Sequence, residues 1–199
     1  GAGATGIDNI WHDSKANGEE EPAGFNPMWH IMNLKNGIAG SYREAYGLTP
    51  ATDPDDTLQG QYVYSFDAGT QSASLWNETR KSYLSIEDDK VMQRKVDYVI
   101  EQGIGGVMFW ELAGDYAWHA DKGEYFFGDT LTSIAYEGFK NSTPYGNKKA
   151  EIAMPAQVLD IQVTYNGFKL GDQNYPIAPK INFLNNSDID IPGGSVVEF

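Results

Sequence analysis

Gly103 to Asp115, which reads GIGGVMFWELAGD, is the stretch of sequence that decides the fold. Its middle, Ile104–Trp110, is apolar and carries no charge. A continuous apolar run of this length is typical of a strand buried on both faces of a parallel sheet. Trp110 and Glu111 stand at its C-terminal end, where parallel α/β folds bind ligands. The same pattern also describes a core strand that ends in a packed Trp.

A helix is predicted immediately before this strand, over Ser85–Gly103. Ser85 is the expected N-cap, and acidic residues follow it at the positive end of the helix dipole. Three apolar residues at i, i+4 and i+7 form the expected buried stripe: Met92, Val96 and Val99. Gly103 ends the helix. A helix, a short link and a buried strand make one αβ unit of a barrel.

Gly105–Glu111 resembles the last barrel strand of the family 18 glycoside hydrolases, the chitinases. Ser82–Asp88 and Lys95–Val99 resemble the seventh helix of that family and the approach to it. Tyr62–Trp76 resembles the stretch that leaves the family's small insertion domain. The resemblance covers roughly residues 30–140 and is most specific between Ser82 and Asp115.

Composition limits the classes of partner. The chain has 199 residues, 41% of them hydrophobic, and a net charge of −14. This charge argues against nucleic acid or an anionic membrane as partner and fits a neutral polymer substrate or a secreted protein. The 5 Trp, 12 Tyr and 9 Phe suit sugar-stacking platforms, although aromatic rings also fill cores. With no cysteine and three unclustered histidines, we expect no metal site and no cofactor.

The first 81 residues divide into two segments. Residues 1–24 read as a loop that follows a barrel strand, and residues 25–81 as a segment of an α+β insertion domain. Within the second segment the pattern predicts a short helix over Ser41–Tyr46. It also predicts a strand over Gln61–Phe66 and a hairpin partner running from Leu75 to Tyr83.

Residues 82–141 are interpreted as the last helix–strand–helix of the barrel. Tyr116–Tyr125 reads as a polar, aromatic loop. Thr130–Asn141 reads as the closing helix, with Asp129 as its N-cap. Residues 142–155 change composition abruptly and are predicted to be a linker.

In residues 156–199 the pattern changes to period two. One strand is predicted within Val158–Tyr165, a second over Lys180–Leu184, and a third over Ser195–Phe199. The segment resembles the start of the β-sandwich accessory domains of bacterial chitinases, so we interpret it as an incomplete sandwich domain.

The predicted fold class is therefore α/β. It comprises the C-terminal portion of a TIM (β/α)8 barrel with part of an α+β insertion domain, followed by the first strands of a β-sandwich. A complete barrel has eight strand–helix units and about 250 residues. We therefore expect the chain to be part of a larger or nicked enzyme, with the missing N-terminal barrel segment as its partner.

The resemblance implies hydrolysis of chitin or chito-oligosaccharides by a secreted enzyme. Members of the family carry Asp-x-x-Asp-x-Asp-x-Glu on the fourth strand, and that Glu is the general acid. No such spacing occurs here; Asp53–Asp56 supplies acids without the Glu. We therefore expect no catalytic residue in this chain, which alone would be inactive. The resemblance implies retaining, substrate-assisted cleavage, in which the sugar's own acetamido oxygen acts as nucleophile.

Trp110 corresponds to the family Trp that stacks under the sugar at the cleavage subsite. Three other Trp side chains are candidate outer-subsite rings or simply packed residues: Trp76, Trp29 and Trp11. Glu111 points away from Trp110 if the strand is regular, and Asp115 is expected to be a cap or turn residue. The alternative function is a catalytically inactive, chitinase-like carbohydrate-binding protein or a subunit of a larger assembly.

Overall fold

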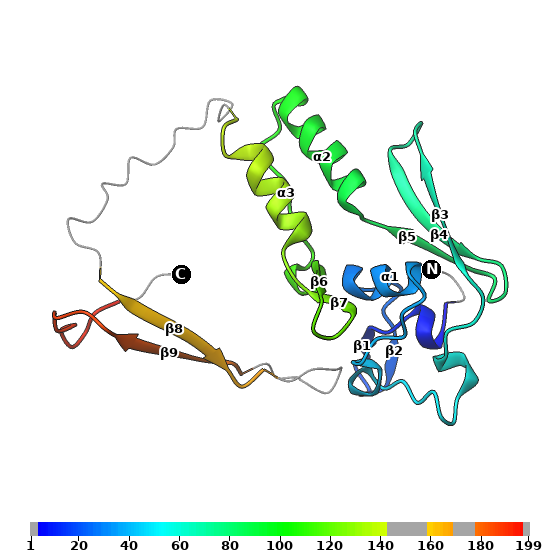
Figure 1. The fold of residues 1–199 in the computed structure, drawn as a ribbon, viewed down its shortest axis with the longest axis horizontal. Coiled ribbons are helices and arrows are strands. Elements are labelled where there is room, and N and C mark those ends of the chain that lie inside the picture. The colour runs from blue at the N-terminus through cyan, green and yellow to red at the C-terminus, as the bar shows by residue number, and fades with distance from the viewer. Residues whose placement is uncertain (1–3, 143–158, 169–177, 197–199) are drawn as a thin grey trace. The chain divides into compact units, whose positions relative to one another are not determined.

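A computed structural model describes residues 4–142, 159–168 and 178–196 of the chain. The chain divides into two compact units, Gly1–Asn147 and Lys148–Phe199. Figure 1 shows the ribbon with its elements labelled in chain order.

The first unit combines α-helices, 3-10 turns and short antiparallel strands. Its helices are α1 (Met28–Lys35), α2 (Asp89–Gln102) and α3 (Thr130–Phe139), and its 3-10 turns are η1 (Gly6–Asp8), η2 (Arg43–Tyr46), η3 (Pro54–Asp56) and η4 (Leu112–Gly114). Its strands are β1 (His12–Ser14), β2 (Glu20–Pro22), β3 (Tyr62–Asp67), β4 (Ser72–Asn77), β5 (Ser82–Ile86), β6 (Tyr116–His119) and β7 (Glu124–Phe127).

The largest sheet of the first unit is the antiparallel meander β3-β4-β5. The predicted strand in this region is confirmed by β3, which pairs along its whole length with β4. The predicted hairpin partner is wrong in one respect, because β4 ends at Asn77 and a turn precedes β5. The Asn77 side chain accepts a hydrogen bond from the Arg80 backbone N–H at 3.1 Å, and Lys81 adopts a positive φ of 52°. This local hydrogen bond turns the chain into a third strand.

The core of the first unit surrounds Trp29 of α1, which is completely buried. Four aromatic rings contact its indole with centroid distances of 4.6–5.5 Å: Tyr42, Tyr46, Phe126 and Phe127. The segment predicted as an N-terminal loop contains β1 and β2, and it buries Ile7 and Ile10 completely. Asn26 fixes this segment, because its side chain bonds the Asp8 carbonyl and the Ile10 N–H.

Helix α2 confirms most of the predicted helix. Its N-cap is Asp88 rather than Ser85, because Ser85 belongs to β5 and the Asp88 carboxylate accepts the Val91 N–H at 3.0 Å. Gly103 ends the helix in the left-handed region, and the expected apolar stripe is buried. A Cβ at Gly138 of α3 would lie 2.3 Å from a methyl carbon of Val96, so the close approach of α2 and α3 requires glycine.

The predicted buried strand over Ile104–Trp110 is not formed. The segment has no strand assignment, and Met108 is 78% and Trp110 81% exposed. A buried strand requires hydrogen-bonded neighbours on both sides. Within the described residues no strand pairs with this segment. Ile104, Met108 and Trp110 are exposed, whereas Val107 and Phe109 are partly buried against the core.

The predicted loop over Tyr116–Tyr125 is instead largely the hairpin β6-β7. Trp118 pairs with Tyr125 across the two strands, and their rings meet edge to face with centroids 4.9 Å apart. Ser41, at the start of the predicted short helix, donates from its backbone N–H and its hydroxyl to the Glu124 carboxylate at 2.5 and 2.6 Å. The helical turn therefore begins later, as η2, and Gly47 ends it with a φ of 78°.

The second unit contains β8 (Ile161–Asn166) and β9 (Lys180–Asn185), which pair antiparallel. They confirm two of the three strands predicted here. Ser195 and Val196 are not in a strand, and the rest of the predicted third strand lies outside the described residues. The predicted linker also lies outside them, apart from Ser142.

The described residues form one three-stranded and three two-stranded sheets, all antiparallel, and none of these sheets is closed. A barrel is therefore not seen in this part of the chain. None of the helices in the described ranges is long and apolar enough to cross a membrane.

Candidate functional site

A cavity of about 550 Å³ lies beside the segment that carries Trp110. Its walls come from the end of β5, from α2, from the loop before α1 and from the first turn of α3. Its lining residues are Trp11, Phe25, Asn26, Pro27, Met28, Ser85, Ile86, Glu87, Met92, Lys95, Val107, Met108, Phe109, Trp110, Glu111, Gly114, Asp115 and Leu131. The cavity thus combines aromatic rings, aliphatic side chains and carboxylates.

The turn that follows Trp110 is held at two points. The Trp29 indole N–H donates to the carbonyl of Ala113 at 2.9 Å. The Asp115 carboxylate accepts the backbone N–H groups of Leu131 and Thr132, both at 2.9 Å. The core and the start of α3 therefore fix the position at which the Trp110 indole reaches solvent.

Asp115 confirms the cap role expected for it, since it satisfies free N–H groups in the first turn of α3. Asp129, the predicted N-cap of that helix, makes no side-chain capping hydrogen bond. Asp115 is remote in sequence from the helix that it caps, so the helix-start pattern could not reveal it.

The four candidate Trp side chains have different surroundings. Trp110 and Trp11 line the same cavity, and Trp11 packs edge to face on Phe25 with ring centroids 5.2 Å apart. Trp76 lies on β4 outside the cavity, with 38% of its surface exposed. Trp29 is fully buried, so it is a packed core residue, and no sugar can reach the face of its ring. The structure therefore brings together two of the four.

Glu87 is a cavity residue that the sequence interpretation did not select. One of its carboxylate oxygens contacts the Lys95 ammonium at 2.5 Å. Its other oxygen is inaccessible and has no hydrogen-bond partner within the described residues. Glu87 is one of the acidic residues that follow Ser85 and were assigned to the first turn of the helix, but it precedes the actual N-cap, Asp88. The alternation of β5, which sends Ser85 outward and Ile86 inward, was the signal that could have found it.

Glu111 differs from its predicted orientation. A regular strand would direct Trp110 and Glu111 to opposite sides. The structure has no strand here, and both residues line the cavity. Glu111 therefore adds a second carboxylate beside the exposed indole.

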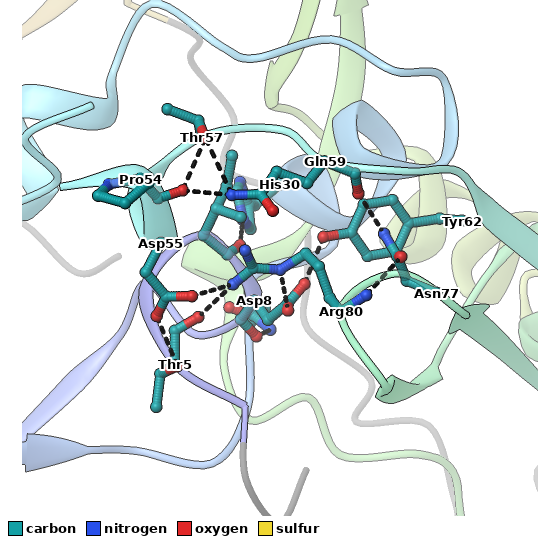
Figure 2. Close-up of polar contacts among 12 residues, drawn as sticks. Thr5, Asp8, His30, Pro54, Asp55, Thr57, Gln59, Tyr62, Asn77 and Arg80 are labelled. Carbon is teal, nitrogen blue, oxygen red and sulfur yellow. Dashed lines mark hydrogen bonds and ion pairs between the residues drawn. The ribbon is translucent and has the colours of Figure 1, made fainter. Parts of the chain in front are cut away.

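A second cavity, of about 470 Å³, is lined by polar residues around Arg80 (Figure 2). The Arg80 guanidinium donates to Asp8 at 2.5 Å and to Asp55 at 2.8 Å. Tyr62 donates its hydroxyl hydrogen bond to Asp8 as well. The hydrogen bond from Thr5, and then the Arg80 guanidinium, lower the pKa of the Asp55 carboxyl. The Arg80 guanidinium pairs with both carboxylates, and the cluster joins η1 and η3 to the β4–β5 turn.

The acids of Asp53–Asp56 also have local structural partners. Asp53 accepts the Asp55 N–H at 2.9 Å and so caps η3, whereas Asp56 accepts the Thr49 N–H at 2.6 Å. These contacts occupy the carboxylates with backbone groups and with Arg80, which supports a structural role for the run.

His30 is a neutral structural residue at pH 7. Burial lowers the pKa of His30 to about 4. Its Nε2 lies 2.7 Å from the Ile7 carbonyl, so Nε2 carries the proton and Nδ1 accepts from the Tyr42 hydroxyl, also at 2.7 Å. Both ring nitrogens are therefore engaged within the core.

Comparison with known proteins identifies the family. Residues 8–115, more than half of the chain, match the model of glycosyl hydrolases family 18. The chain belongs to glycoside hydrolase family 18. Residues 124–199 match a second model, described as Chitinase C.

A solved family 18 chitinase from Chromobacterium violaceum is similar over 93% of this chain, with 46% identity and a TM-score of 0.65. Chitinase ChiA of Flavobacterium johnsoniae is 39% identical over 54 residues, which are 27% of this chain. Chitinase A1 of Niallia circulans is 42% identical over 41 residues, which are 21% of it. The family 18 resemblance expected from Gly105–Glu111 is thereby confirmed.

The family 18 chain spans only part of these relatives. The match covers 27% of the solved Chromobacterium chain and 3% and 6% of the two curated chitinases. The described residues have a chitinase-like fold of mixed helices and strands, without the closed sheet of a barrel.

Proposed function

We propose that this family 18 chain forms part of a secreted enzyme that hydrolyses chitin, and that Trp110 is the floor on which the substrate sugar stacks. The observation that supports this proposal most directly is the Trp110 indole, which is 81% exposed although its turn is anchored at Ala113 and Asp115. A large aromatic ring held open to solvent presents a flat apolar surface to the C–H face of a sugar.

The proposed reaction is cleavage of a β-1,4-linked N-acetylglucosamine chain with retention of configuration. The acetamido oxygen of the sugar attacks its own anomeric carbon while a general-acid Glu protonates the departing glycosidic oxygen. That Glu is proposed to come from a segment outside this chain, because the Asp-x-x-Asp-x-Asp-x-Glu spacing that carries it in the family does not occur in these 199 residues. The role of Trp110 is to hold the sugar in the distorted ring shape that the reaction requires.

In the complete enzyme, the segment Ile104–Trp110 is proposed to pair with a barrel strand that this chain does not contain. Ile104, Met108 and Trp110 are exposed in a segment that no described strand pairs with. A barrel strand supplied by the N-terminal segment of the enzyme would bond the backbone there and cover the aliphatic side chains. Trp110 would then lie at the C-terminal end of the last strand, which is where barrels bind their substrates.

The test is the Trp110→Ala variant of the complete enzyme, assayed on short chito-oligosaccharides. We expect turnover to fall about ten- to a hundredfold, since roughly 1–5 kcal/mol of substrate distortion depends on such contacts. Tyr136→Ala is the matched control, because Tyr136 is an exposed aromatic residue on α3 outside the cavity. Unchanged turnover in Trp110→Ala would refute the role of Trp110. Binding without any hydrolysis by the unaltered enzyme would favour the inactive carbohydrate-binding alternative.

A further inference from the structure

The outward face of the sheet β3-β4-β5 carries a row of large exposed side chains. Val63, Trp76 and Tyr83 stand directly opposite one another in the register of the three strands. All three are exposed, whereas Tyr62, Leu75 and Leu84 on the other face are buried. Directly opposite residues have Cβ atoms about 4.5–5.5 Å apart. The indole and the phenol ring therefore lie side by side on one open surface, at the sheet labelled β3, β4 and β5 in Figure 1.

The rest of this face is rich in hydroxyl groups, and its strands carry no cation. A second row across the sheet consists of serines only: Ser65, Ser74 and Ser85. The strands β3, β4 and β5 contain no Lys or Arg. Asp67, at the end of β3, is the one ionisable acid on them. Such a surface offers apolar contact and neutral hydrogen bonding, the combination that an uncharged, polyhydroxylated ligand requires.

The Trp76 ring is held in place at its polar edge. Its indole N–H donates to the Glu78 carboxylate at 2.9 Å, and Glu78 also pairs with Lys81 in the same turn. The indole N–H is therefore satisfied within the turn. An aromatic ring fixed in this way loses little conformational entropy when a ligand stacks on it.

The face continues into the cavity that holds Trp110. Ser85 lines that cavity and stands two residues after Tyr83, so both side chains project from the same side of β5. One surface therefore runs from the exposed indole of Trp110 past Ser85 to Tyr83 and Trp76. A linear ligand that occupies the cavity has a path along this sheet.

We propose that the Val63–Trp76–Tyr83 row is a second binding site for a neutral saccharide chain, which stacks on Trp76 and Tyr83 and bonds to the serine hydroxyls. A neutral sugar polymer fits better than a nucleic acid or another acidic polymer, since the chain has a net charge of −14, the three strands contain no Lys or Arg, and the nearby Lys81 is paired with Glu78. The identity of the sugar, N-acetylglucosamine, rests on the proposed function. The existence of the site depends only on the exposed side chains of the sheet β3-β4-β5.

The test measures chitohexaose binding to the 199-residue chain by isothermal titration calorimetry. Trp76→Ala and Tyr83→Ala are compared with Tyr136→Ala, which removes an exposed aromatic ring on α3, away from the sheet. We expect each sheet variant to weaken binding by about two- to tenfold, the usual value of one aromatic contact, and the Tyr136 variant to bind like the unaltered chain. We expect the double variant to lose more affinity than either single variant.

Failure of this site and failure of the proposed function give different results. If Trp76→Ala and Tyr83→Ala bind chitohexaose as well as Tyr136→Ala does, or if the unaltered chain does not bind it, the sheet site is refuted. The proposed function is judged separately, by the turnover of Trp110→Ala. Sedimentation of the unaltered chain as a dimer that Trp76→Ala converts to a monomer would assign the face to a second copy and overturn the proposal.

Discussion

The sheet β3-β4-β5 and the segment Ile104–Trp110 both contain many apolar residues, yet only in the sheet does the backbone pair with neighbouring strands. Each strand of the sheet finds a partner within a few residues, through turns that bring consecutive strands together. The Ile104–Trp110 segment has no partner strand among the described residues, and Ile104, Met108 and Trp110 stay exposed while only Val107 and Phe109 pack partly against the core. An apolar run therefore predicts burial only where the chain also supplies the neighbouring backbone.

Arg80→Ala is expected to lower the free energy of unfolding of the region around the sheet β3-β4-β5 by the largest amount. This change leaves the buried Asp8 carboxylate without its cation, and removing one partner of a buried ion pair costs about 3–5 kcal/mol. Lys81→Ala is the matched control, because its pair with Glu78 is exposed to solvent, which screens the attraction and leaves it little effect on stability. Urea unfolding of the two variants measures the difference. Equal free energies of unfolding would show that the cluster does not hold the turn to η1.

A paired substitution compares the two regions directly. Leu75→Ala in β4 removes a completely buried side chain and should lower the free energy of unfolding by about 2–5 kcal/mol. Met108→Ala removes a side chain that is 78% exposed and should change it by less than about 0.5 kcal/mol. Urea midpoints of the two variants test this contrast. A large loss for Met108→Ala would mean that the segment is packed after all.

The smallest effect concerns the anchored end of the Trp110 segment. Asp115→Ala removes the carboxylate that caps α3 and should lower the free energy of unfolding by about 1 kcal/mol. Asp129→Ala is the control, since Asp129 makes no capping side-chain bond. Thermal unfolding of both variants measures the contrast, and a larger loss for Asp129→Ala would assign the cap to the residue adjacent to the helix.

The sequence predicted elements whose signals are local. Helix α2 ends at Gly103 as expected, because a glycine that can adopt positive φ follows an amphipathic stripe. Its start was placed too early, because Ser85 and Asp88 both suit an N-cap and only the pairing of β5 decides between them. The hairpin β6-β7 was missed because its polar and aromatic residues also suit a loop.

The candidate site was predicted only in part. Trp110 was selected from its motif, and the structure shows it exposed beside a cavity. The sequence treated Trp29, Trp76 and Trp11 alike, because an isolated Trp carries no local signal of burial. Glu87 was missed because the helix was started too early, at Ser85, whereas Glu87 lies between the end of β5 and Asp88, the N-cap of α2.

By itself, the sequence determined the family resemblance, the helix that precedes Gly103 and the strand β3, since each depends on residues close together in the chain. The tertiary structure decided which Trp side chains line the cavity, which acids pair with Arg80 and which helix Asp115 caps. Those outcomes depend on contacts between residues such as Trp29 and Ala113, or Arg80 and Asp8, that are far apart in sequence. Such contacts form only when the packed chain brings the two partners within bonding distance.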